Sequence, residues 1–147
     1  GVLPLWGGHP DTEAPSPGRG WCFSLGWFYT HYKAVGMEFS TKEGAEIYDF
    51  VAVYRSWMPE RDRPYRIVME AWPERDAAGT HICWRQRMKW WDAAESEPEI
   101  WLELSDHSVP MPDLEYGVAL IASRCQVEFG PVQVTPLADG GNLHMGA

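Results

Sequence analysis

Residues 81–105 read HICWRQRMKWWDAAESEPEIWLELS, and this stretch decides the fold class. Apolar and polar residues alternate along 81–91 and again along 99–104, with a loop of small, acidic and proline residues between them. A period of two places alternate side chains on the same face of a strand, and such a break is typical of a turn. The stretch therefore predicts an antiparallel β-hairpin.

The predicted hairpin has one apolar face and one face on which charged residues alternate with indole rings. On the first strand the apolar face carries Ile82, Trp84, Met88 and Trp90, and the opposite face carries His81, Arg85, Arg87, Lys89 and Trp91. A loop over residues 92–98 sets Trp91 opposite Glu99, Lys89 opposite Trp101 and Arg87 opposite Glu103. We expect cross-strand ion pairs on the charged face and the Lys89 ammonium group resting on the Trp101 ring.

The same alternation predicts further strands on both sides of the hairpin. We expect strands over residues 21–29, 33–41, 47–57, 65–72, 81–91, 100–104, 116–123 and 125–135, the last bent at Gly130-Pro131. The domain is then residues 21–137. The prolines and glycines of residues 1–20 predict a lead-in without a central strand, and residues 138–147 a loose tail.

About eight short strands predict an all-β domain with protected sheet edges. Two architectures satisfy this: a single antiparallel β-sandwich of jelly-roll type, or an eight-stranded, lipocalin-like up-and-down barrel. The bent last strand and the long connections that contain proline favour the sandwich.

The composition is that of one globular domain with an acidic surface. The chain has 147 residues, which suits a single core, and its formal net charge is -9. This charge disfavours partnership with nucleic acid or with an anionic membrane. No apolar run reaches the about 18 residues of a membrane-spanning helix, and the start GVLPLWGGHP carries no visible targeting signal.

Common catalytic and metal-binding motifs are absent from the sequence. It contains no nucleophile elbow, no phosphate-binding loop, no dinucleotide fingerprint and no H-E-x-x-H, and its five histidines lack paired spacing. We therefore expect no catalytic residues, no cofactor and no metal site. Cys22, Cys83 and Cys125 allow at most one disulfide, and we expect three reduced thiols.

Tryptophan is the unusual component, with nine residues in the chain. An exposed indole ring flanked by carboxylate and guanidinium groups offers a sugar a flat apolar platform and directional polar partners. We expect ligand-binding residues on the charged face of the hairpin and around the turn MPERDRP at residues 58–64. These candidates are Trp101, Trp91, Trp57, Trp72, Tyr54, Arg85, Arg87, Lys89, Glu99 and Glu103. Further aromatic residues near the first turn are Trp27, Tyr29 and Tyr32.

Residues 80–137 resemble the non-catalytic carbohydrate-binding modules of the galactose-binding, jelly-roll type. The likeness lies in WRQRMKWW (84–91), EIWLELSD (99–106) and VEFGPVQVTPL (127–137). The resemblance implies binding of a polysaccharide or oligosaccharide without turnover, in an extracellular module appended to a glycoside-degrading enzyme. Structural calcium, common in that group, has no supporting motif here, because Gly130-Pro131 stands where the family has an acidic residue.

Two other functions are consistent with the pattern. A barrel lined by inward-pointing tryptophans could hold a small apolar ligand and act as an isomerase or cyclase. A sandwich domain could also serve a structural role by assembling with copies of itself. The direction in which the indole rings point separates these alternatives from sugar binding.

Overall fold

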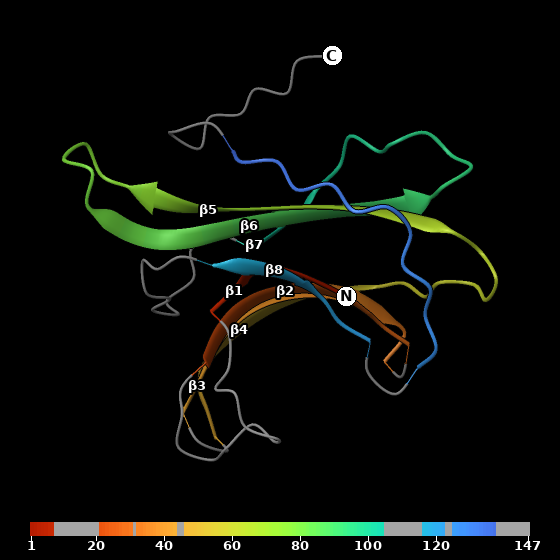
Figure 1. Ribbon diagram of the computed structural model, residues 1–147, viewed down its shortest axis with the longest axis horizontal. Helices are drawn as coiled ribbons and strands as arrows, with labels where there is room; N and C mark the ends of the chain where they lie inside the picture. Colours follow the sequence, from red (N-terminus) through yellow and green to blue (C-terminus); the bar gives the residue numbers. More distant parts are fainter. Residues whose placement is uncertain (8–20, 31, 44–45, 105–115, 123–124, 138–147) are drawn as a thin grey trace.

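The computed structural model describes residues 1–7, 21–30, 32–43, 46–104, 116–122 and 125–137. These residues form two antiparallel sheets and contain no helix (Figure 1). The strands are β1 (Val2–Trp6), β2 (Trp21–Tyr29), β3 (Ala34–Glu43), β4 (Glu46–Ser56), β5 (Tyr65–Arg75), β6 (His81–Asp92), β7 (Leu102–Leu104) and β8 (Gly117–Leu120).

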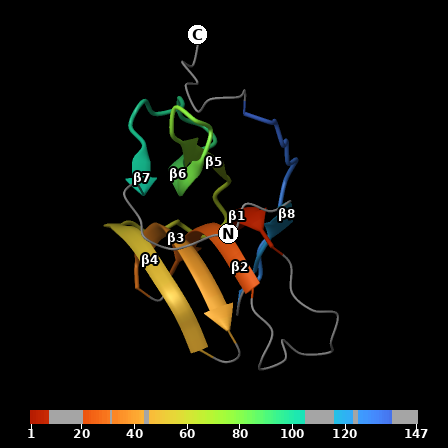
Figure 2. The same ribbon diagram turned by 90° about the vertical axis from the view of Figure 1, so that its left-hand side faces the viewer.

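The two sheets lie as layers, one over the other (Figure 2). One sheet has five strands in the order β4-β3-β2-β1-β8, and the other has three in the order β5-β6-β7. The chain completes the first four strands, crosses to the second sheet, and returns to place β8 beside β1. The sheets are not hydrogen-bonded into a closed cylinder. The predicted antiparallel sandwich is therefore confirmed, and the barrel alternative is wrong.

The core lies between the two sheets and is centred on β3. Val35, Met37 and Phe39 are fully buried there and belong to one apolar cluster with Trp84 and Met88 of β6. Because these residues recur at every second position, each strand gives one face to the core and the other to the outside. Two outer faces therefore remain to be considered as binding surfaces.

A polar contact crosses this core between β2 and β6. The Ser24 hydroxyl on β2 donates a hydrogen bond to Oε1 of Gln86 on β6, and both side chains are buried. A buried polar group is costly unless it is paired, so this bond favours one alignment of the two sheets over others.

The predicted strands agree with the structure except at the two ends of the domain. The bounds of β2 agree fully with the predicted residues 21–29, and those of β3 to β6 agree to within a few residues. The prediction that residues 1–20 lack a central strand is wrong for Val2–Trp6, because β1 lies between β2 and β8. The register of β1 shifts between Val2 and Leu5 in its pairing with β2, and between Leu3 and Trp6 in its pairing with β8. Both intervals contain Pro4, which lacks a backbone N–H.

The predicted strand over residues 125–135 is also wrong. Residues 125–137 belong to no strand in the described structure, and they run past the three-stranded sheet (Figure 1). Pro131 removes a donor in the middle of the segment, which weakens any ladder built there. Exposed apolar side chains follow the segment at Val127, Phe129, Val132 and Val134.

Candidate ligand-binding surfaces

The outer face of the three-stranded sheet carries the charged residues that the hairpin pattern predicts. We call it the charged face. Its residues from β5, β6 and β7 are Glu70, Trp72, Glu74, Arg85, Arg87, Lys89 and Glu103, with Trp101 just before β7. Arg87 lies opposite Glu103, as the predicted register requires, and opposite Glu70 on its other side. Ile100 lies outside the short β7, and its side chain is exposed.

The basic side chains of this face are engaged in ion pairs. Arg87 Nε lies 2.6 Å from Glu70 Oε2, and both side chains are largely buried. Arg85 pairs with Glu74, and Lys89 with Glu97 in the loop between β6 and β7. Only 5% of the Lys89 side chain is exposed, and the carboxylate of Glu97 balances its charge within the domain.

The Trp101 ring covers two of these cations. Arg87 Cζ and Lys89 Nζ each lie 4.3 Å from its centroid, so the predicted contact between Lys89 and Trp101 is confirmed. Arg87 Cζ also lies 5.7 Å from the centroid of the Trp72 ring. Cation–π contacts use the ring face that a sugar would need. This arrangement indicates that the charged face is held together internally.

Trp91 is buried, and Trp57 is partly buried against the core. Trp91 is only 9% exposed, so the expectation that it forms a platform is wrong. Trp57 packs against the core, with its ring centroid 5.0 Å from that of Phe28 and 5.8 Å from that of Trp90. Glu99 is exposed in the loop before β7. The structure therefore does not gather the candidates of the hairpin and the turn into one site.

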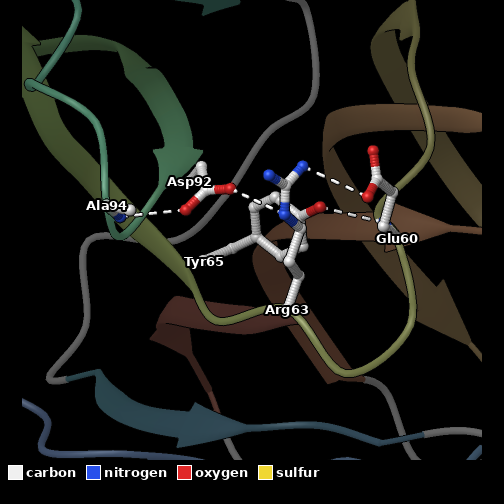
Figure 3. Close-up of polar contacts among 5 residues, drawn as sticks. All are labelled: Glu60, Arg63, Tyr65, Asp92 and Ala94. Carbon is white, nitrogen blue, oxygen red and sulfur yellow. Dashed lines mark hydrogen bonds and ion pairs between the residues drawn. The ribbon is translucent and has the colours of Figure 1, made fainter.

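The turn at residues 58–64 is tied to the end of β6 (Figure 3). Arg63 lies 3.1 Å from a carboxylate oxygen of Glu60 and 3.1 Å from one of Asp92. The Tyr65 hydroxyl accepts a hydrogen bond of 2.9 Å from the Glu60 backbone, and Asp92 accepts one of 2.9 Å from Ala94. These contacts give the charged residues of the turn a structural role, because they join the connection between β4 and β5 to the start of the loop between β6 and β7.

The outer face of the five-stranded sheet presents a group of exposed rings, which we call the aromatic patch: Trp27, Tyr29, Tyr32 and Tyr54. Tyr29, Tyr32 and Tyr54 are 41%, 68% and 51% exposed, and Trp27 is half-buried beside them. The Trp27 ring lies 4.6 Å from that of Tyr29 and 5.6 Å from that of Tyr54, and Tyr29 lies 4.7 Å from Tyr32. The rings therefore form a continuous aromatic surface.

Gly36 allows this surface to form. It pairs with Trp27 on one side and with Tyr54 on the other, so the three residues make one row across β2, β3 and β4. A Cβ atom at Gly36 would lie 2.6 Å from Cδ1 of Tyr54 and 2.8 Å from the carbonyl oxygen of Val53. A side chain at this position would displace the Tyr54 ring, and the row needs glycine.

Glu38 supplies a carboxylate beside the rings, on the same face of β3 as Gly36. Nε1 of Trp27 donates a hydrogen bond of 3.2 Å to Glu38 Oε2. Burial raises the pKa of Glu38 above its ordinary value, and the hydrogen bond from Trp27 opposes part of that rise. Burial, and then the charge of Glu38, raise the pKa of Tyr54. The patch thus combines apolar ring surface with one directional acceptor.

Replacing Glu38 by Gln should stabilise the domain at neutral pH. The folded chain holds a proton on Glu38 above the ordinary pKa of 4.5, where the unfolded chain has lost it, so the unfolding free energy falls as pH rises through that interval. Gln does not titrate and still accepts from Trp27. At about pH 7 we expect the melting temperature of Glu38→Gln, measured by circular dichroism, to lie above that of the wild type. Below about pH 4 the two melting temperatures should be equal. A difference independent of pH would contradict this account.

Sequence reasoning grouped the tyrosines with Trp27 but did not select Glu38. The signal was present, because Glu38 lies between Met37 and Phe39 on a strand whose opposite face carries Val35, Met37 and Phe39. Pairing residues 21–29 with 33–41 as a hairpin would have placed it next to Trp27. That pairing was the missing step.

The remaining chemistry in the described residues is sparse. The Cys125 thiol is free, the Cys83 thiol donates a hydrogen bond of 3.5 Å to Glu74 Oε2, and the side chain of Cys22 lies outside the description. Within the described ranges, no three His, Cys, Asp or Glu side chains gather closely enough to hold a metal ion. The same ranges contain no helix of the length and apolarity that a membrane crossing requires. Comparisons with protein-family models, curated proteins and solved structures find no significant match to this chain.

Proposed function

We propose that this domain binds carbohydrate without catalysis and that the aromatic patch is its binding surface. The observation that carries the proposal is that the exposed rings of the aromatic patch lie next to the carboxylate of Glu38, which accepts only one hydrogen bond among the described residues. Apolar C–H faces of a saccharide stack on such rings, while hydroxyl groups donate to the carboxylate.

The aromatic patch supports the proposal better than the charged face does. On the charged face, Trp101 lies over Arg87 and Lys89, and both cations also have acidic partners. A ligand would have to compete with those contacts. On the aromatic patch the rings of Tyr29, Tyr32 and Tyr54 expose large areas to solvent, which a ligand can cover.

Overall charge narrows the class of glycan. At a net charge of -9 the chain repels strongly anionic polysaccharides, so neutral or cationic chains fit best. An extracellular module attached to a polysaccharide-degrading enzyme would use such binding to stay near its substrate. This setting is part of the proposal.

A glycan array followed by a tryptophan-emission titration tests the proposed function. On the array the wild-type chain should bind one class of neutral or amino-bearing glycan. Titration with that glycan should change the tryptophan emission of the chain, because Trp27 lies in the aromatic patch. Tyr54→Ala should weaken this binding, whereas Trp101→Ala, on the other sheet, should leave it intact. Absence of any glycan binding, or loss of binding only with Trp101→Ala, would refute the proposal.

Self-assembly is a second candidate function, favoured by a separate observation. The extended segment at residues 125–137 carries Val127, Phe129, Val132 and Val134, which are all exposed. Exposed apolar rows of this kind commonly mark contacts between proteins.

We expect the scattering mass of the wild type to rise with concentration if this segment joins copies of the chain. Phe129→Glu should keep the mass at the monomer value, because it places a charge in the apolar row. Gln133→Glu adds the same charge at a polar position of the segment and serves as the matched control. A monomer mass for the wild type at every concentration would exclude this second function.

A further inference from the structure

Glu38 is a partly buried carboxylate with unused acceptor capacity. Its cross-strand neighbours are Leu25 on β2 and Ala52 on β4, and neither can donate a side-chain hydrogen bond. Trp27 Nε1 bonds to one of its oxygens. In the described part of the chain, no Lys, Arg or His forms an ion pair with it. A carboxylate has about four acceptor positions, so the described residues leave most of its capacity unused.

The surroundings of Glu38 favour a positive partner. Tyr54 is the described titratable neighbour, and its raised pKa keeps the phenol neutral at ordinary pH, so it does not balance the carboxylate charge. The faces of the Trp27 and Tyr54 rings also attract cations through their π electrons. The excess of acidic residues over basic ones, 21 against 12, adds a long-range attraction of the same sign.

We infer that the preferred ligand of the aromatic patch is a saccharide with a free amino group, its ammonium ion paired with Glu38 and its ring stacked on the neighbouring aromatic side chains. The inference rests on the proposed carbohydrate binding and specifies the class of sugar. A neutral glycan would stack on the rings and donate hydroxyl groups to Glu38. A protonated amino sugar would in addition pair its positive charge with the carboxylate of Glu38.

Two tetrasaccharides that differ only at nitrogen test the inference. The wild-type chain is titrated with the tetramer of glucosamine and with the tetramer of N-acetylglucosamine at about pH 6, where an amine with a pKa of about 8 is charged. We expect the glucosamine tetramer to bind about tenfold more tightly, the effect of one hydrogen bond between charged groups. The preference should shrink as salt is raised.

Glu38→Gln separates the charge from the shape of the site. This variant should bind both tetramers with about the affinity of the wild type for the acetylated one, within about twofold. Glu103→Gln removes an exposed carboxylate from the other sheet and should keep the preference, which controls for net charge. If Glu38→Gln does not fold, the salt dependence of the wild-type preference carries the test.

The outcomes separate this inference from the proposed function. Equal binding of both tetramers to the wild type, or a preference that survives Glu38→Gln, would overturn the amino-sugar assignment and leave carbohydrate binding in place. A preference that does not change with salt would also overturn it, since ion pairing at a surface is screened. Binding of neither tetramer, with an empty glycan array, would overturn both.

Discussion

Replacing Trp27 by Ala should remove most of the affinity for glycan. Trp27 contacts Tyr29 and Tyr54 and also orients Glu38 through its indole nitrogen, so one substitution removes ring surface and a positioning hydrogen bond together. Truncating such a central aromatic residue typically costs about 2 kcal/mol or more, which is about thirtyfold in Kd. Calorimetric titration with the best glycan from the array measures this loss.

Trp27→Phe is the matched comparison for that experiment. It keeps an aromatic ring but has no N–H to donate to Glu38, so its affinity should lie between those of the wild type and Trp27→Ala. Thermal melting of both variants shows whether the sheet is intact. An unchanged affinity in Trp27→Ala would remove the aromatic patch from consideration as the binding surface.

Replacing Phe39 by Ala should have the largest effect on stability. Phe39 is fully buried in the centre of the core cluster, where its ring has no solvent-exposed surface. Emptying such a site costs about 3–5 kcal/mol, from the lost transfer free energy and the remaining cavity. For a chain of this size we expect a fall in Tm of about 10 °C.

Tyr32→Ala is the control for the Phe39 experiment, since it removes a similar ring that is exposed. Its effect on the unfolding free energy should stay within about 0.5 kcal/mol. Chemical denaturation of the two variants with the wild type gives the comparison. Equal stability of Phe39→Ala and the wild type would contradict the position of β3 at the centre of the core.

The hairpin could be predicted from sequence because its two faces differ strongly in polarity. The alternation in HICWRQRMKWW fixed both the strand and the placement of Arg87 opposite Glu103. The pairing of Lys89 with Trp101 followed from the same count. What the pattern could not show is that loop residues close over this face, as Glu97 does on Lys89.

Which face of β2 packs against the core could not be predicted from hydrophobicity. Leu25 and Trp27 lie on the outer face, while the core face of the same strand carries Ser24 and Gly26. A Cβ atom at Gly26 would lie 2.5 Å from the sulfur of Met69, so close contact between the sheets requires a glycine there. Leu25 and Trp27 consequently face outward while Phe28 packs against the core, and an assignment based on apolarity alone places Leu25 and Trp27 in the core.

The position of β1 within its sheet sets the order in which the domain can be completed. Val2 pairs with Leu120 and Leu3 with Ala119. One edge of β1 therefore stays unpaired until residues more than a hundred positions later in the sequence have been synthesised. A ribosome adds about 5–20 residues per second, so several seconds pass between the two strands. During that interval the nascent chain carries an unpaired edge at β1, open to pairing with other chains.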